Sequence, residues 1–234
     1  MFPDMKDFNE LEQKLGIHFI NPALLRQAFT HRSYLNENPD KALEHNERLE
    51  FLGDAVLELA VTEYLYRNYP NPEGELTSWR AALVNTQTMG DIARDLGFND
   101  YLLLSKGEAR DETGRARQAI LANTFEAVIG ALYLDQSYAV ARSFIGSYIL
   151  THLTAIIEGR LYKDSKSFFQ ERAQESEGIT PAYEVVSEFG PDHNKIFRIG
   201  VYLGEELIAE GEGNSKQEAE QDAARRALEA KGWK

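Results

Sequence analysis

The chain has 234 residues, 43% of them hydrophobic and 27% charged, which excludes a disordered, collagen-like or low-complexity protein. No uninterrupted apolar run approaches the ~18 residues that a membrane helix needs, and the acidic N-terminal stretch is unlike a signal peptide, so we expect a soluble, cytoplasmic protein without a membrane partner. The formal net charge of −13 opposes a general phosphate-binding field, but it suits a protein that gathers carboxylates around a divalent cation.

Over about the first 158 residues, the hydrophobic positions recur with the period of an α-helix. One helix is predicted to open with Asn21 as its N-cap and Pro22 at its first position. A longer helix covers about 46–69 and ends in the turn residues 70–74. Further helices are predicted at 76–84, 86–96 with Gly97 as C-cap, 118–134 and 138–157, and an exposed loop at 104–117.

Beyond residue 160 the pattern changes to helix, three strands, helix. The helices are predicted at 166–176 and 215–231, and the strands at 183–188, 195–203 and 206–211. Ser215 and Glu218 are spaced as a capping box, in which each side chain satisfies a free amide group of the other residue. We therefore predict a multidomain chain, with an all-α domain at 1–160 and a small α+β domain at 165–233.

Acidic residues share one side of the predicted helix 46–69. Glu47, Glu50 and Asp54 fall within about 60° of one another on a helical wheel, while the opposite side carries Leu49, Leu52, Val56 and Leu59. The simplest alternative is a solvated acidic face. Two residues instead favour contacts of this helix with other parts of the protein. Phe51 is aimed away from the leucines, which predicts a subunit contact. Gly53 costs about 1 kcal/mol relative to alanine inside a helix, and close approach of another element would justify that cost.

The predicted helix 122–134 is apolar nearly all round, so it should be buried. Asn123 and Glu126 interrupt it as i, i+3 neighbours on one face. A structural hydrogen bond or salt bridge is the alternative to a cation here, because a buried carboxylate needs one or the other. If this face meets the acidic side of helix 46–69, then Glu50, Asp54, Asn123 and Glu126 form an all-oxygen site of the kind that Mg²⁺ prefers.

Other metal and nucleophile chemistries are less well supported. The chain has no cysteine, which excludes disulfides, thiolate metal ligands and cysteine nucleophiles. A di-iron carboxylate bundle would need Glu-x-x-His pairs, which these helices lack. The histidines at 18, 31, 45 and 152 are scattered singly, which is typical of structural or solvent-facing residues.

The C-terminal domain carries polar groups suited to the minor groove of an RNA duplex. Lys216 lies in the first turn of the last helix, where free amide groups favour phosphate. His193 lies in a loop, and the domain's first helix has a polar face formed by Ser167, Gln170, Glu171 and Gln174. A solvated face on a small interaction domain is the alternative interpretation.

The stretch 46–57 (NERLEFLGDAVL) closely resembles the signature of the ribonuclease III family. Further family blocks follow in the same order at 30–34 (THRSY), 73–74 (EG), 106–108 (KGE) and 121–127 (LANTFEA). The tail resembles a double-stranded-RNA-binding domain through 190–193 (GPDH) and 216–219 (KQEA). Together these resemblances cover nearly the whole chain, in the bacterial order of nuclease domain and then RNA-binding domain.

The resemblance implies a homodimeric endoribonuclease that depends on Mg²⁺, with Mn²⁺ as a possible substitute and no small-molecule cofactor beyond the metal. It would cut both strands of duplex RNA to 5′-phosphate and 3′-hydroxyl ends with short 3′ overhangs, in ribosomal-RNA precursor processing and messenger-RNA turnover.

The resemblance also assigns roles to residues of this sequence. It makes Asp54 and Glu126 the catalytic acids and places metal at Glu50, Asp54 and Glu126. It gives Glu47 and Glu73 secondary acidic roles near the RNA and the dimer face, and it inserts Phe51 into the partner subunit. Its expected RNA contacts are Ser167, Gln170, Glu171, Gln174, His193, Ser215 and Lys216.

Asn123 departs from the family pattern, because aspartate is usual at this position. An amide oxygen still binds Mg²⁺ but brings no negative charge. Three interpretations stay open: a natural enzyme that works with asparagine, an engineered block, and a catalytically weakened or silent duplex-RNA-binding dimer. A protein-interaction scaffold with merely solvated acidic faces is a further alternative. In the tail, Gln217 and Glu220 replace lysines common in such domains.

Overall fold

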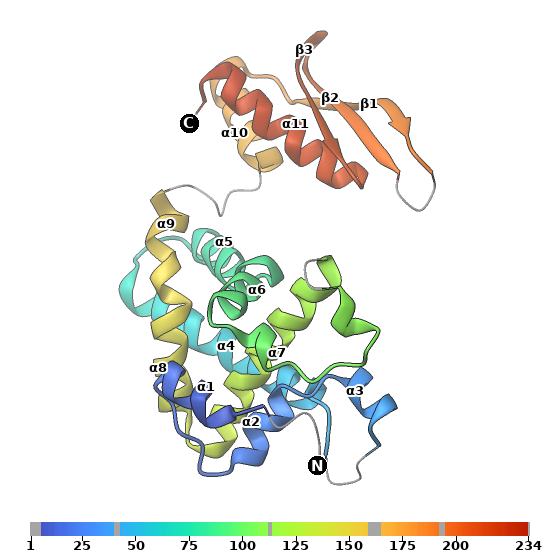
Figure 1. The fold of residues 1–234 in the computed structure, drawn as a ribbon. Coiled ribbons are helices and arrows are strands. Elements are labelled where there is room, and N and C mark those ends of the chain that lie inside the picture. The colour runs from blue at the N-terminus through green and yellow to red at the C-terminus, as the bar shows by residue number, and fades with distance from the viewer. Residues whose placement is uncertain (1–5, 40–42, 112–113, 159–164, 192–194, 234) are drawn as a thin grey trace. The chain divides into compact units, whose positions relative to one another are not determined.

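The computed structural model describes residues 6–39, 43–111, 114–158, 165–191 and 195–233 (Figure 1). The chain divides into two compact units, one up to residue 162 and one from residue 163. The elements of the first unit are helical: α1 (Phe8–Leu15), α2 (Pro22–Ala28), α3 (Arg32–Glu37), α4 (Glu47–Asn68), α5 (Glu73–Leu83), α6 (Thr86–Asp95), η1 (Phe98–Asp100), η2 (Glu108–Arg110), α7 (Arg115–Asp135), α8 (Tyr138–Tyr148), η3 (Leu150–His152) and α9 (Leu153–Glu158).

The second unit consists of α10 (Ser165–Glu177), β1 (Ala182–Phe189), β2 (Ile196–Leu203), β3 (Glu206–Gly213) and α11 (Lys216–Lys231). The strands form an antiparallel sheet in the order β1-β2-β3, and α10 and α11 pack against each other. The predicted order of helix, three strands and helix is therefore confirmed, as is the all-helical first unit.

Helix α7 is the centre of the first unit, and α2, α4, α6 and α8 pack against it. The helix is buried on most sides, as its apolar composition predicts, and Leu121, Phe125 and Ile129 are fully inaccessible. Phe125 joins a run of aromatic rings with Phe98 and Phe144 at centroid distances of 6.1 and 5.6 Å. This burial fixes the position of α7, and therefore the positions of the polar residues that it carries.

Two glycines let α4 and α7 cross at backbone contact. A Cβ atom placed on Gly53 would lie 1.8 Å from the backbone oxygen of Glu126, and one on Gly130 would lie 2.2 Å from the backbone oxygen of Leu49. Real side chains do not tolerate such distances, so each position needs glycine. The close approach predicted from Gly53 is confirmed, and its partner is α7.

The sequence-based boundaries differ from the structure at several places. Helix α5 begins at Glu73, within the predicted turn 70–74, because Pro72 already occupies its N-cap. The predicted single helix 138–157 is divided into α8, η3 and α9. The helices α1 and α3 were not predicted; each is short, and the side chains of Asp7 and His31 cap their first turns.

The predicted exposed loop 104–117 is wrong at its C-terminal end. Helix α7 already begins at Arg115, and Arg117 is only 3% exposed. Its guanidinium donates hydrogen bonds to the backbone oxygens of Asp111 at 3.0 Å and Glu108 at 2.7 Å, and to the Asn99 side chain at 3.3 Å. A charged residue is buried here because loop carbonyls satisfy it, an arrangement that no sequence period indicates.

In the described residues, the stretch Tyr138–Glu158 is long and apolar enough to cross a membrane by length and composition alone. Its side chains Phe144, Ile145, Ile149 and Leu153 lie in the hydrophobic core of the first unit. One side of the stretch therefore packs in the core, and 33% of it is buried.

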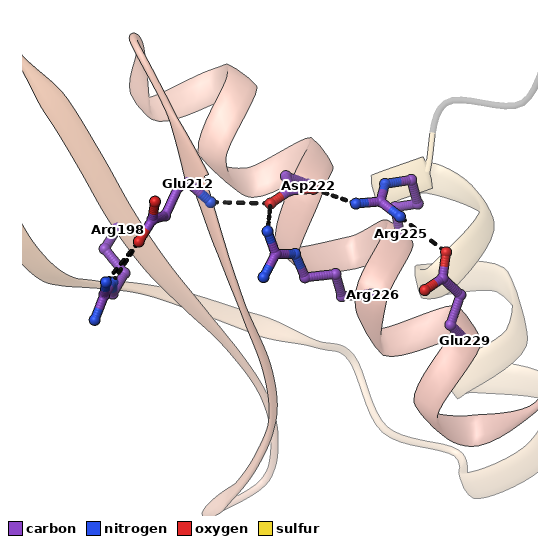
Figure 2. Close-up of polar contacts among 6 residues, drawn as sticks. All are labelled: Arg198, Glu212, Asp222, Arg225, Arg226 and Glu229. Carbon is purple, nitrogen blue, oxygen red and sulfur yellow. Dashed lines mark hydrogen bonds and ion pairs between the residues drawn. The ribbon is translucent and has the colours of Figure 1, made fainter.

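In the second unit, α11 packs on the sheet through small residues, and a hydrogen bond connects it to β3. A Cβ on Gly211 of β3 would lie 2.0 Å from the backbone nitrogen of Ala223 in α11. The backbone N–H of Glu212 donates to Asp222 at 3.0 Å, and Asp222 also pairs with Arg225 and Arg226 (Figure 2). Partial burial alone would raise the pKa of Asp222. The hydrogen bonds from the Glu212 N–H, Arg225 and Arg226 outweigh it and hold that pKa below its ordinary value.

Substitution of Gly53 by alanine tests the helix crossing. We expect Gly53→Ala to lower the free energy of unfolding by about 2 kcal/mol or more, because the added methyl forces α4 and α7 apart. Gly146→Ala in α8 is the matched control: nothing lies within 4 Å of its Cβ position, and relief of helical glycine should stabilise the protein by about 0.5–1 kcal/mol. Denaturant unfolding of both variants measures the difference, and equal effects would contradict the crossing.

Candidate active site between α4 and α7

The glycine crossing brings the four predicted metal ligands within about one helical turn of the contact between α4 and α7. Glu50 and Asp54 flank Gly53 on α4, and the backbone of Glu126 faces that glycine from α7. Asn123 lies one turn earlier on α7, and its side chain hydrogen bonds to Glu50. Asp54 is exposed, while Glu50, Asn123 and Glu126 are half-buried. The structure therefore gathers these residues in one acidic cluster at the edge of the core.

The electrostatics of this cluster are dominated by negative charge. Burial is the largest factor that raises the pKa of Glu126 to about 8, and the carboxylates of Asp54, Glu50 and Glu58 add to it. Burial, followed by Glu47 and Asp54, also raises the pKa of Glu50, against the hydrogen bond from Asn123. Every charged group acting on these two glutamates is a carboxylate, so the site favours a bound cation or a bound proton.

The donor chemistry of the cluster fits a hard cation. Three carboxylates and one amide offer only oxygen ligands, which suit Mg²⁺ or Mn²⁺. Within the described residues, no three histidine or acidic side chains converge as a compact metal-binding group.

The two secondary acidic residues lie outside this cluster. Glu47 is exposed and pairs with Arg32 at 3.1 Å and His45 at 3.7 Å. Glu73 begins α5, accepts a hydrogen bond from the Thr77 hydroxyl at 3.0 Å, and lines a cavity of about 690 Å³ beside the last turns of α4. Within one chain, the structure thus brings Glu47 near Glu50 but leaves Glu73 apart.

Segments 30–34 and 104–108 are joined beside the cluster. The backbone N–H of Ser105 donates to Ser33 Oγ at 3.1 Å, and that of Lys106 donates to Glu37 Oε2 at 3.1 Å. His31 caps α3, and burial lowers its pKa although Glu108 and Glu47 oppose that shift. A neutral His31 suits this structural role, which agrees with the prediction for the single histidines.

An exposed apolar stripe follows α4 beside the acidic cluster. Phe51 is 81% exposed, as its position on the wheel predicts, and Leu59 and Tyr66 on the same side are 56% and 80% exposed. The expectation that Leu59 faces the core is wrong. Its position lies at the edge of the apolar arc of α4, whereas Leu49, Leu52 and Val56 of that arc pack against the core. The spacing of residues 51, 59 and 66 could have indicated the stripe from the sequence.

The predicted RNA contacts of α10 and α11 are exposed where the structure describes them. Ser167, Gln170, Glu171 and Gln174 are exposed on α10, and the Gln174 amide donates to the Thr180 hydroxyl at 2.6 Å. Ser215 caps α11 by accepting from the Glu218 N–H at 3.1 Å, as predicted, and the Glu218 carboxylate accepts from the Asn214 N–H at 2.9 Å. Lys216 is exposed. His193 lies outside the described residues.

Comparison with known proteins accounts for both units. The sequence profile of the family described as Ribonuclease-III-like matches residues 21–153, and that of the double-stranded RNA binding motif matches 165–231. Ribonuclease 3 of Oceanobacillus iheyensis is 46% identical over 225 residues, covering 96% of this chain and 98% of that protein. The chain belongs to the ribonuclease III family. Ribonuclease 3 of Carboxydothermus hydrogenoformans is 44% identical over 227 residues, covering 97% of this chain and 96% of that protein.

A solved ribonuclease III supports the same assignment for the first unit. The nuclease domain of the Campylobacter jejuni enzyme is 37% identical, with a TM-score of 0.56, and covers 62% of this chain and 97% of that domain. That structure concerns flexibility in a region involved in dimer formation. Membership in this family makes the chain a double-strand-specific endoribonuclease, which confirms the expected enzyme class.

The raised pKa of Glu126 predicts how the metal-free enzyme depends on pH. The folded enzyme keeps this proton up to about pH 8, whereas the unfolded chain releases it near 4.5, so stability falls as pH rises through that interval. In EDTA, Glu126→Gln should unfold at a higher temperature than wild type at pH 9, and the gap should close toward pH 4.5.

Thermal unfolding followed by circular dichroism across this pH range measures the effect. Glu205→Gln is the matched control, because it also removes one carboxylate, from the exposed turn between β2 and β3. A gap between wild type and Glu126→Gln that stays constant with pH would contradict the assignment of the shift to Glu126.

Proposed function

We propose that this ribonuclease III is a Mg²⁺-dependent hydrolase, able to use Mn²⁺, in which Glu50, Asp54, Asn123 and Glu126 bind the metal and Asp54 and Glu126 are the catalytic acids. The observation that carries this proposal is the all-oxygen cluster at the glycine crossing, where burial and neighbouring carboxylates raise the pKa of Glu126 to about 8. A group of like charges held together by the fold is stable only with a proton or a cation, and a divalent cation satisfies several of them together.

The residues of the cluster differ in solvent exposure, and we assign them different roles on that basis. Asp54 is exposed, so it faces the space where a phosphodiester would lie, whereas the half-buried Glu126 binds from the side of the core. Asn123 orients Glu50 through their hydrogen bond. When bound, Mg²⁺ would supply Lewis-acid stabilisation of charge on the phosphate and lower the pKa of an attacking water.

The products and cellular role follow the family resemblance. Hydrolysis of both strands of duplex RNA would leave 5′-phosphate and 3′-hydroxyl ends with short 3′ overhangs. We assign the enzyme to ribosomal-RNA precursor processing and messenger-RNA turnover in the cytoplasm. The double-stranded RNA binding motif at 165–231 supports duplex RNA as the substrate, with contacts from Ser167, Gln170, Glu171, Gln174, His193, Ser215 and Lys216.

A second candidate function is a silent duplex-RNA-binding dimer, favoured by Asn123. The amide contributes no charge to the cluster, so the metal site has one fewer negative charge than the family pattern. The proposed enzyme is retained because Glu50, Asp54 and Glu126 still act on one another electrostatically at the crossing of α4 and α7. The two functions share every feature of the fold and differ only in cleavage.

Cleavage of a long RNA duplex and of its single strand at graded Mg²⁺ concentrations tests the proposed function. We expect the wild-type enzyme to cut only the duplex, to stop in EDTA, and to lose activity in Glu126→Gln. Asn123→Asp should lower the Mg²⁺ concentration for half-maximal rate by roughly tenfold, because it restores a negative charge. Duplex binding without cleavage at any Mg²⁺ concentration, rescued by Asn123→Asp, would favour the silent binder instead.

We also propose a homodimer formed through the apolar stripe of α4. Phe51, Leu59 and Tyr66 leave a large apolar surface on one helix, and the adjacent cavity near Tyr66 and Leu76 offers space for Phe51 of a second copy. Glu73 lines that cavity, so a partner could bring this secondary acidic residue toward the interface.

Charge placed on the stripe should dissociate the dimer. We expect Leu59→Glu to be monomeric at micromolar concentration in light scattering coupled to size exclusion, since a charge would be desolvated in an apolar interface. Leu134→Glu is the matched control, because Leu134 on α7 is 55% exposed and lies outside the stripe. A dimer that survives Leu59→Glu and Phe51→Asp would refute this interface.

A further inference from the structure

A cleft of about 430 Å³ opens between the second half of α4 and helix α8. Glu63, Tyr64 and Arg67 line it from α4, and Arg142 lines it from α8. Glu63 follows Asp54 by roughly 13 Å along the helix axis, at 1.5 Å for each residue. The cleft is therefore separate from the acidic cluster, and none of the roles assigned so far uses it.

Two arginines share the one carboxylate that lines this cleft. Arg67 places a guanidinium nitrogen 2.6 Å from Glu63 Oε1, and Arg142 places one 3.5 Å from Glu63 Oε2. The Tyr138 hydroxyl also donates to Oε2, at 2.9 Å. Among the residues that the structure describes, Glu63 is the single carboxylate paired with either arginine. The group therefore carries one excess positive charge, in a chain whose net charge is −13.

The positive groups are the accessible part of this arrangement. The side chains of Arg67 and Arg142 are 66% and 53% exposed, whereas that of Glu63 is 23% exposed. At 3.5 Å, Arg142 is held less closely than Arg67, and it shares its acceptor oxygen with a hydroxyl. Guanidinium groups bind phosphate oxygens through paired, charge-assisted hydrogen bonds. An incoming phosphate therefore finds two suitable donors on opposite walls of the cleft.

Gly146 borders the open space of the same cleft. It lies inside α8, where glycine is less favourable than alanine by about 1 kcal/mol, and nothing lies within 4 Å of its Cβ position. Gly53 and Gly130, in contrast, are required by backbone contact between α4 and α7. Packing gives no reason for glycine at position 146. A side chain there would instead extend into the cleft.

Tyr64 adds an aromatic surface to the cleft. Its side chain is 37% exposed, and Ser143 and Ser147 line the facing wall on α8. Aromatic side chains stack on nucleobases with little dependence on which base is present. The volume of the cleft also falls within the range of small-molecule sites. Together, the two arginines and this ring match a ligand in which a phosphate is joined to a flat aromatic group.

We propose that the cleft between α4 and α8 binds a free nucleotide, with its phosphate between Arg67 and Arg142 and its base on Tyr64. Glu63 is the counter-ion of both arginines in the ligand-free protein, and the phosphate replaces it at Arg142. A free nucleotide suits the cleft better than an RNA duplex, whose bases are already paired and stacked and cannot reach Tyr64. The site does not depend on the proposed cleavage chemistry.

Calorimetric titration of the full-length protein with AMP in EDTA tests the site without cleavage. We expect one AMP to bind per chain, and adenosine or inorganic phosphate alone to bind at least tenfold more weakly, because each makes only part of the contacts. Arg142→Gln should weaken AMP binding by roughly tenfold through loss of a charge-assisted contact. Arg94→Gln is the matched control, because it removes an exposed arginine of α6 that pairs with Asp91 at 2.8 Å.

Two further variants separate a ligand site from a structural ion pair. Gly146→Leu should fill the cleft and weaken AMP binding at least tenfold without any change of charge, and Gly146→Ala should weaken it less. Glu63→Gln should bind AMP several-fold more tightly, because an amide still accepts from Tyr138 but no longer competes for Arg142. A purely structural Glu63 would leave affinity unchanged or lower. Circular dichroism establishes that each variant folds.

The outcomes distinguish this inference from the proposed function. Absence of AMP binding by the wild-type protein at millimolar concentration would overturn the site, as would binding that Arg142→Gln and Gly146→Leu leave unchanged. Weaker binding of duplex RNA by Arg142→Gln, with no AMP binding, would assign the arginines to the RNA backbone instead. Absence of duplex cleavage would overturn the proposed function alone. Should Arg142→Gln fail to fold, Arg142→Lys retains the charge without the paired donors and should still weaken AMP binding.

Discussion

The contact of α4 with α7 at Gly53 and Gly130 is the constraint on which the first unit depends. Each glycine meets the backbone of the opposite helix, so neither helix can move away without losing packing and neither can carry a side chain at that level. The contact sets the distance between the acidic residues of the two helices. Core packing thereby determines the geometry of the candidate active site, which lies one turn to either side of the crossing.

This arrangement places like charges where they destabilise the fold. Glu50 and Glu126 both have a raised pKa because they are desolvated beside other carboxylates. The surrounding hydrophobic core, centred on α7, compensates for that cost. Such a balance between a favourable core and a strained polar cluster is characteristic of active sites, where function and stability make opposite demands. Asn123 reduces the repulsion by replacing one expected carboxylate with a hydrogen-bond donor to Glu50.

In the second unit, charges of opposite sign lie next to one another instead of charges of like sign. Its basic side chains engage acidic neighbours at the surface, as the network from Arg198 through Asp222 to Glu229 illustrates (Figure 2). Exposed ion pairs of this kind contribute little stability individually, so the packing of α11 on the sheet through Gly211 and small alanines supports the fold. RNA affinity must then come from a few polar and basic side chains at specific positions, since the net charge of the whole chain is −13.

Periodicity and spacing in the sequence were sufficient for the two-unit organisation, the buried α7, the exposed Phe51 and the residues of the acidic cluster. These features are local, because they depend on which face of a helix a residue occupies. The exposure of Leu59, the burial of Arg117 and the meeting of Arg142 with Glu63 were decided by tertiary structure. Each depends on which segment packs against another, and neither helical nor strand periodicity carries that information. The same holds for the raised pKa of Glu126, because desolvation arises only when α4 and α7 close over it.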